Sequence, residues 1–206
     1  SGLPGMIEAL QDVVIDRGRP MIGICVGMQL LAERGLEHGT HEGLGWIKGD
    51  VVLIEPKDER LRVPHMGWNE LDLCSPVHPV FEGVAQGAHV YFVHSYGFSC
   101  RDSANVLAVV EYGGRLVAAI GRDNIVGTQF HPEKSAAAGL QLLANFAQWQ
   151  PSILRPRPQR PEPPLRTTRS VPRRSRTSRT AARCASSSSS WPRTAAKFPP
   201  NCCVDR

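Results

Sequence analysis

The stretch Gly23-Ile24-Cys25-Val26-Gly27-Met28-Gln29 decides the fold of this chain. Cys25 ends the continuously apolar run 20–25, which is typical of a strand buried on both faces of a parallel sheet. Residues 28–33 read as a helix, so Cys25 lies at a junction between strand and helix. The pattern G-x-C-x-G is the thiol version of a nucleophile elbow, in which small residues permit a sharp turn that exposes the nucleophile.

Two interpretations of Cys25 remain open at this point. The N-terminus of a following helix would stabilise negative charge on the sulfur and favour a reactive thiolate. The alternative is a structural cysteine, because free cysteines are commonly buried in cores.

Apolar periodicity predicts the elements on both sides of this stretch. A helix is expected over residues 6–15, and strands and loops are expected from Gly45 to Val93. Later strands are predicted at 105–112, 116–120 and 124–128, with Gly113-Gly114 as a hairpin turn between the first two. A last helix begins after Lys134 and ends before Pro151. This order predicts an α/β fold.

Charge divides the 206 residues into two parts. Residues 1–150 carry 11 Lys and Arg against 17 Asp and Glu, and residues 151–206 carry 13 against 2. The basic character therefore belongs to the second part, and we expect no nucleic-acid binding by the first. We predict a domain over 1–150 and a disordered Arg/Pro/Ser-rich tail over 151–206, because the tail has too few aliphatic residues to offset its ordering entropy.

Several classes of protein find no support in the sequence. No apolar run approaches the roughly 20 residues that span a bilayer, and no secretory signal is visible, so we expect a cytoplasmic protein without membrane contact. The six cysteines form no C-x-x-C pair and no Cys/His cluster, which argues against a zinc site or a disulfide framework. We expect no metal and no cofactor.

His131-Pro132-Glu133 follows the apolar run Ile125 to Phe130 and supplies what a nucleophilic cysteine needs. A histidine accepts the thiol proton and later delivers it to the leaving group, and a carboxylate fixes the ring orientation. Taken alone, the tripeptide would more often be a surface turn. Together with the elbow at Cys25, it predicts a catalytic Cys-His-Glu triad.

The two motifs Gly-Ile-Cys-Val-Gly-Met-Gln and Gly-Thr-Gln-Phe-His-Pro-Glu-Lys-Ser resemble the signatures of class I glutamine amidotransferases. Within that class, residues 64–69 (Pro-His-Met-Gly-Trp-Asn) and 91–96 (Tyr-Phe-Val-His-Ser-Tyr) are similar to the glutaminase subunits of imidazole glycerol phosphate synthases. The resemblance extends from about residue 3 to residue 150. It implies a flavodoxin-like α/β fold with a doubly wound mixed sheet.

The resemblance also implies roles for single residues. Cys25 would attack the side-chain amide of L-glutamine, His131 would relay the proton and Glu133 would orient His131. Gln29 and the backbone around Ser95 and Tyr96 would hold the substrate, and the backbone N–H of Val26 would be an oxyanion donor. Gln29 follows Cys25 by four residues, so on a helix both lie on one face.

A cyclase (β/α) barrel subunit is the partner that the resemblance implies, as a heterodimer in histidine biosynthesis. The segment Pro64, His65, Met66, Gly67, Trp68, Asn69 resembles part of that contact. Met66 and Trp68 could equally be core residues, because aromatic and thioether side chains bury well. We interpret His65 and His94 as structural, since neither belongs to a ligand cluster.

The chain departs from the family in two places. It lacks the first strands of the sheet and a Pro-Gly-x-Gly loop that supplies a second oxyanion donor. Loss of one donor typically slows catalysis by roughly 10² to 10³, so we expect a weak or inactive glutaminase. For residues 151–206 we favour translation out of frame, with a basic arm that binds RNA or acidic surfaces as the alternative.

Two further functions stay open. Another class I amidotransferase, of the anthranilate, GMP or carbamoyl phosphate type, is disfavoured by the segment 64–69. A catalytically dead module that keeps only its docking surface is a function of a different class.

Overall fold

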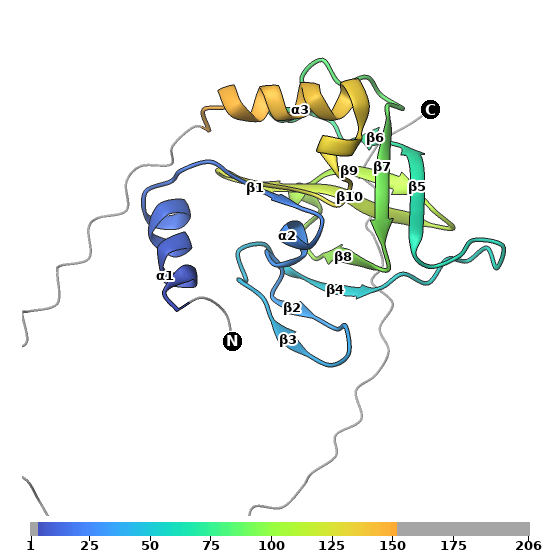
Figure 1. Ribbon diagram of the computed structural model, residues 1–206, viewed down its shortest axis with the longest axis horizontal. Helices are drawn as coiled ribbons and strands as arrows, with labels where there is room; N and C mark the ends of the chain where they lie inside the picture. Colours follow the sequence, from blue (N-terminus) through green and yellow to red (C-terminus); the bar gives the residue numbers. More distant parts are fainter. Residues whose placement is uncertain (1–3, 152–206) are drawn as a thin grey trace, which may run out of the picture. The chain divides into compact units, whose positions relative to one another are not determined.

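The computed structural model describes residues 4–151. Figure 1 shows helices on both sides of strands that gather into three sheets. The helical elements are α1 (Met6–Leu10), η1 (Gln11–Asp16), α2 (Val26–Gln29), η2 (Pro79–Phe81), η3 (Ser103–Asn105), η4 (Pro132–Lys134) and α3 (Ala136–Gln148). The strands are β1 (Met21–Ile24), β2 (Arg34–Gly35), β3 (His41–Glu42), β4 (Gly49–Leu53), β5 (His65–Glu70), β6 (Asp72–Leu73), β7 (His89–His94), β8 (Tyr96–Cys100), β9 (Val106–Glu111), β10 (Arg115–Arg122) and β11 (Ile125–Thr128).

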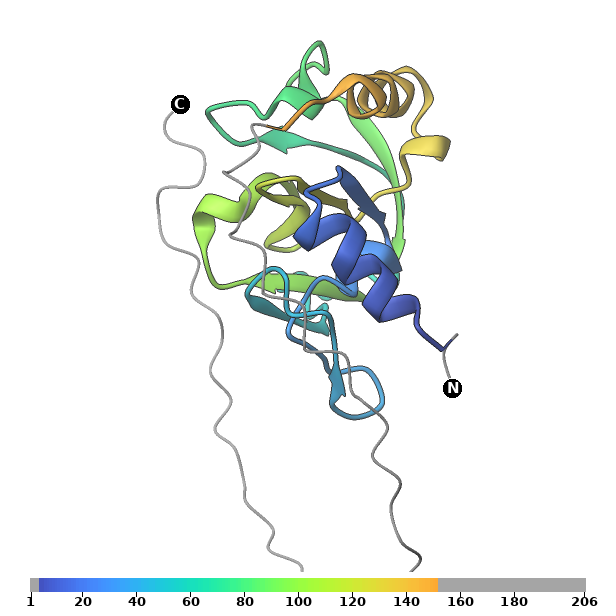
Figure 2. The ribbon, with the colours of Figure 1, turned by 90° about the vertical axis from the view of Figure 1, so that its left-hand side faces the viewer.

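A five-stranded mixed sheet with the order β1-β11-β10-β9-β6 carries the fold. β1 pairs with β11 in parallel, and the other neighbours pair antiparallel. Successive residues of β11 enter different cores: Ile125 packs in one cluster with Val14 and Met28, and Val126 in another with Leu142. The sheet is therefore buried on both faces, as alternation along a strand requires. α3 lies on one side and α1 on the other (Figures 1 and 2).

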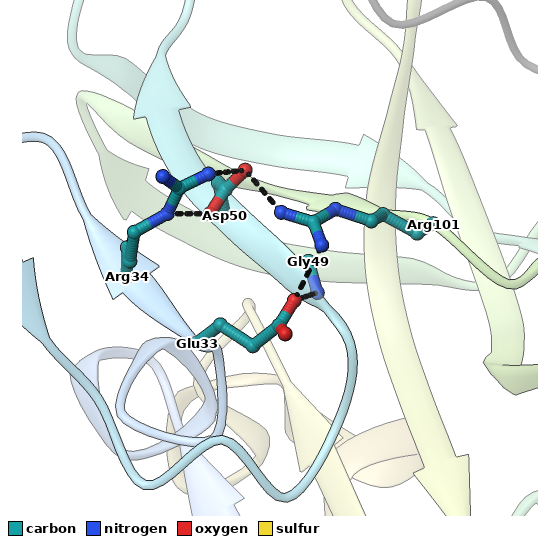
Figure 3. A network of polar contacts seen from close by, with 5 residues as sticks. All are labelled: Glu33, Arg34, Gly49, Asp50 and Arg101. Atoms are coloured by element: carbon teal, nitrogen blue, oxygen red, sulfur yellow. Dashed lines mark hydrogen bonds and ion pairs between the residues drawn. The ribbon is translucent and has the colours of Figure 1, made fainter.

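Two smaller sheets extend this frame, a four-stranded one with the order β3-β2-β4-β8 and the pair β5-β7. A network of ion pairs ties the four-stranded sheet together (Figure 3). Arg34 binds Asp50 through two hydrogen bonds of 2.8 and 2.9 Å, and Arg101 bridges Asp50 at 3.1 Å and Glu33 at 2.9 Å. The hydrogen bond from Arg34 chiefly lowers the pKa of Asp50, with Arg101 adding to it. Glu33 also accepts from the N–H of Gly49, so the network anchors the chain shortly after α2.

The helix predicted over residues 28–33 is wrong for its second half. α2 begins at Val26 and ends at Gln29. The N–H of Glu33, which an α-helix would bond to the Gln29 carbonyl, instead donates to the Gly49 carbonyl over 2.9 Å. Tertiary hydrogen bonds thus replace the helical ones, and the chain proceeds to β2.

The remaining elements agree with their predictions. The helix expected over 6–15 is present as α1 and η1, the last helix as α3, and the three later strands as β9, β10 and β11. Gly113 and Gly114 both have positive φ (65° and 147°) in the turn that joins β9 to β10. The α/β fold class is confirmed.

No helix within residues 4–151 is both long and apolar enough to cross a membrane. The tail predicted over 151–206 lies outside the described residues, apart from Pro151. The boundary at residue 150 stays a prediction.

Candidate active site

Cys25 occupies a strained turn directly after β1. Its φ of 52° and ψ of −109° fall outside the regions that L-residues usually adopt, as expected for a nucleophile elbow. A Cβ placed on Gly23 would lie 2.4 Å from the carbonyl oxygen of Gly27, whereas a Cβ on Gly27 would meet nothing within 4 Å. The close approach of the backbone therefore requires glycine at position 23 and leaves position 27 open.

His131 comes to the same edge of the sheet as Cys25 because β1 and β11 run in parallel. The register pairs Ile24 with Thr128, and the N–H of Cys25 donates to the Thr128 carbonyl over 2.7 Å. Three residues beyond Thr128, the His131 ring lies with its Nδ1 2.7 Å from Glu133 Oε1. Because the carboxylate accepts from Nδ1–H, the neutral ring keeps Nε2 as the acceptor, which is the form that a general base needs.

The Cys25 sulfur contacts Gln129, whose Nε2 lies 3.9 Å away. In the described part of the chain, no hydrogen bond joins this sulfur to the His131 ring. Catalytic hydrogen bonds are often long or incomplete before substrate binds. The charges of Glu133 and Lys134, in the turn that carries His131, both act on the pKa of the thiol.

Burial raises the pKa of the Cys25 thiol, and this effect outweighs the rest. The backbone N–H of Val26 lowers the pKa, the charge of Glu133 raises it, and Lys134 and Gln129 lower it. The backbone N–H of Val26, at the start of α2, thus favours the thiolate as predicted, but burial outweighs this effect. Burial prevails because the thiol is half-buried and α2 has only four residues.

Glu133 stays a carboxylate. Partial burial raises its pKa, but the hydrogen bond from His131, a backbone hydrogen bond and the charges of His131 and Lys134 outweigh burial, and the pKa falls. The pair is thus suited to hold the imidazole ring in one orientation and to stabilise its protonated form.

Two hydrogen bonds hold the side chain of Gln29. Its Nε2 donates to the Tyr96 carbonyl over 2.9 Å and to Gln129 Oε1 over 3.2 Å, which leaves its own Oε1 as an acceptor. The Ser95 carbonyl accepts from the N–H of Ile54 over 2.9 Å. The carbonyls of Ser95 and Tyr96 therefore already have partners within the protein, and their contribution to substrate binding stays a prediction.

Residues 2–149 match the family described as glutamine amidotransferase class-I. The chain belongs to the class-I glutamine amidotransferase family. Two similar curated proteins are imidazole glycerol phosphate synthase subunits HisH. The one from Rhodospirillum rubrum is 60% identical over 150 residues, which are 73% of this chain and 70% of that protein. The one from Brucella suis is 53% identical over 152 residues, covering 72% of this chain and 70% of that protein.

Among solved structures, a putative GMP synthase protein from Thermoplasma acidophilum is similar to this amidotransferase chain, with a TM-score of 0.49 and 22% identity. The match covers 69% of this chain and 62% of that structure, so the chain spans less than two thirds of that protein.

The segment predicted to contact a partner forms β5 of this amidotransferase and alternates between outside and inside. Met66 is 61% exposed and Trp68 is 53% exposed, so neither is a core residue. Trp68 packs edge-on against Tyr91 on β7, with ring centroids 6.0 Å apart. His65, between Pro64 and Met66, is buried and contacts the His94 ring. Two large apolar side chains thus face outward together, as docking surfaces require.

Gln129 is the site residue that sequence reasoning overlooked in this amidotransferase. Its side chain is fully buried and contacts both Gln29 and Cys25. The signal was available, because a polar residue within the apolar run 125–130 must find hydrogen-bond partners inside the protein. Among the described residues, no group of three or more His, Cys, Asp or Glu side chains is arranged to hold a metal ion.

Proposed function

We propose that this chain is the glutaminase subunit of an imidazole glycerol phosphate synthase, which hydrolyses L-glutamine to glutamate and ammonia in histidine biosynthesis. The observation that carries the proposal is the 60% identity to a HisH subunit over 150 residues. The family match over residues 2–149 includes Cys25, His131 and Glu133. The parallel pairing of β1 and β11 supports it, since it brings the thiol and the His–Glu pair to one edge of the sheet.

The chemistry that these residues would perform has two halves. Cys25 gives its proton to His131 and attacks the amide carbon of the glutamine side chain, and His131 passes the proton to the nitrogen that leaves as ammonia. This produces a glutamyl thioester. Water, deprotonated by His131, then breaks the carbon–sulfur bond, which releases glutamate and returns the proton to the thiol. Glu133 holds His131 in the required orientation throughout.

Substrate recognition follows from the donors and acceptors left unused. Within residues 4–151, Gln29 Oε1 accepts no hydrogen bond and is suited to accept an N–H of glutamine. The backbone N–H of Val26 is suited to stabilise the oxyanion.

The partner in this proposal is a cyclase (β/α) barrel subunit that docks on the exposed face of β5, around Met66 and Trp68. Trp68 neighbours Tyr91, whose carbonyl accepts from the N–H of His131 over 3.0 Å. A barrel seated there would cover the site and keep the ammonia from bulk water. We place this heterodimer in the cytoplasm.

The test is labelling of Cys25 by an electrophilic analogue of glutamine, with the chain in complex with its barrel subunit. We expect Cys25 to react at least tenfold faster than Cys74 or Cys100, and Cys25→Ser to abolish both labelling and glutamate release. His131→Ala should slow the labelling strongly. Labelling of Cys25 no faster than that of the other two cysteines would refute the glutaminase and leave a docking module.

A further inference from the structure

Two chains of hydrogen bonds meet at the carbonyl oxygen of Tyr96, at the start of β8. One comes from His94, whose Nδ1 lies 2.9 Å from this oxygen and whose Nε2 lies 3.0 Å from His65 Nδ1. The other comes from Gln29, whose Nε2 donates to the same oxygen and to Gln129. The first chain begins on β5, the strand with the exposed Trp68, and the second ends at the nucleophile.

The Tyr96 carbonyl fixes the direction of every hydrogen bond in the first chain. A carbonyl only accepts, so His94 carries its hydrogen on Nδ1, and its neutral Nε2 must accept from His65 Nδ1–H. The Nε2 of His65 is then also an acceptor, and it faces the amide nitrogen of Asn69 at 3.3 Å. Asn69 uses its other amide hydrogen on the Glu111 carbonyl, 3.0 Å away. Both rings are therefore held in the Nδ1–H tautomer.

The same carbonyl fixes the direction of the hydrogen bonds that run from Gln29 through Gln129 to Cys25. Gln29 must turn its amino group toward Tyr96, and the remaining hydrogen goes to Gln129 Oε1. Gln129 is thereby forced to turn its own amino group toward the Cys25 sulfur. A donor aimed at the sulfur stabilises the thiolate relative to the thiol, whereas a reversed amide would place a repelling oxygen there.

The environment keeps the histidine pair uncharged. His65 and His94 are 2% and 6% exposed, and the His65 ring stacks on Phe92 and Tyr112 with centroids 4.7 and 4.0 Å away. Burial and the nearby His94 lower the pKa of His65 to about 4. Burial likewise lowers the pKa of His94, which also faces the charge of His131. Among the described residues, no carboxylate forms an ion pair with either ring. The hydrogen bond to the Tyr96 carbonyl raises the pKa of His94, but burial outweighs it.

We propose that His94 and Gln129 are positioning residues of the glutaminase site, and that the neutral His65–His94 pair couples the docking strand β5 to the nucleophile through the Tyr96 carbonyl. A partner that presses on Met66 and Trp68 shifts the backbone that carries His65 and Asn69. The shift is passed to the Tyr96 peptide and from there to Gln29 and Gln129. The inference rests on the proposed function for its purpose, but its geometry does not depend on turnover.

The first experiment measures the tautomers directly, by nitrogen NMR of the chain labelled with ¹⁵N-histidine and bound to its barrel subunit. The expected result is the Nδ1–H form for both His65 and His94 between pH 6 and 8, with the His94 signals assigned by their loss in His94→Asn. A different tautomer, a rapid mixture of the two, or a charged ring in either residue would overturn the coupling.

The second experiment measures the pH at which iodoacetamide alkylates Cys25 at half its maximal rate, in the same complex. We expect His94→Leu and Gln129→Leu each to raise this midpoint by about one unit. Gln129→Leu removes the amide that donates to the sulfur. His94→Leu removes the hydrogen bond to the Tyr96 carbonyl, which holds that amide in place through Gln29. His94→Asn, which keeps a donor near the Nδ1 position, should restore the midpoint. His89→Leu, an exposed histidine at the other end of β7, is the matched control and should leave it unchanged.

The outcomes separate the two proposals. An unchanged midpoint in both leucine variants would overturn the positioning role, whatever the rate of glutamine hydrolysis. If the midpoint shifts as expected while glutamine is not hydrolysed, the proposed function fails and the positioning role stands. If His94→Leu does not fold, Gln129→Leu and the tautomer measurement still decide the question.

Discussion

The backbone N–H of Cys25 donates to the Thr128 carbonyl over 2.7 Å, and this bond extends the parallel pairing of β1 and β11 by one residue past the last strand pair. The two strands are about a hundred residues apart in the sequence. Their pairing places the thiol beside the turn with His131 and Glu133. The geometry at this edge of the sheet leads to two predictions, and strand β5 leads to two more.

The close approach of the chain at the elbow predicts opposite effects for its two glycines. Gly23→Ala should lower the free energy of unfolding by about 1–3 kcal/mol, because the added methyl group would lie 2.4 Å from the Gly27 carbonyl oxygen. Gly27→Ala should be neutral or slightly stabilising, since that Cβ meets nothing within 4 Å and the residue belongs to a helix. Urea unfolding of the two variants is the measurement, and equal losses would contradict the elbow geometry.

The contact between Glu133 and His131 predicts that loss of the carboxylate slows catalysis without weakening substrate binding. Glu133→Gln should lower kcat for glutamine hydrolysis by about 10²- to 10⁴-fold and change KM little, because the ring loses its fixed orientation and the partner of its charged form. Steady-state kinetics in complex with the barrel subunit measure this. Glu42→Gln, an exposed glutamate on β3, serves as the control, and a kcat equal to that of the control would argue against an orienting carboxylate.

The low pKa of His65 predicts that the domain loses stability in mild acid. The unfolded chain takes up a proton near pH 6.5, whereas the folded chain does so only at about 4. Between these values the unfolded state binds more protons, so the free energy of unfolding falls as the pH falls. The loss is on the order of 3 kcal/mol when the whole window is crossed.

Urea unfolding at pH 7 and pH 4.5 tests this dependence. His65→Phe keeps the aromatic stacking on Phe92 and Tyr112 but cannot titrate, so its stability should vary less with pH than that of the parent chain. If the free energy of unfolding changed equally with pH in both proteins, His65 would not be the group responsible.

The outward position of Trp68 predicts a defect in assembly rather than in folding. Trp68→Ala should weaken binding of the barrel subunit by about 10- to 100-fold, as expected for a central aromatic anchor, and should leave the unfolding transition nearly unchanged. Leu140→Ala, a 64% exposed residue on α3, is the control. Titration calorimetry with the barrel subunit measures both variants, and equal affinities would remove β5 from the proposed interface.

Local patterns were sufficient for much of the fold. The strands β9, β10 and β11 and the helix α3 follow from apolar periodicity and from Gly and Pro signals, because these act between residues close in the sequence. The second half of the predicted 28–33 helix failed for the opposite reason. The N–H of Glu33 binds the Gly49 carbonyl instead of a helical one, and no property of residues 28–33 indicates that competition.

The candidate site shows the same division. Cys25, His131 and Glu133 stand in short motifs whose residue types and spacing are typical of one family, so the sequence by itself determined the family. The same motifs predict these three residues as the reacting groups. Only the tertiary structure decided that burial raises the pKa of Cys25 and that Gln129 turns its amino group to the sulfur. The physical reason is that desolvation and hydrogen-bond direction depend on neighbours from distant strands, and strand pairing alone brings those neighbours together.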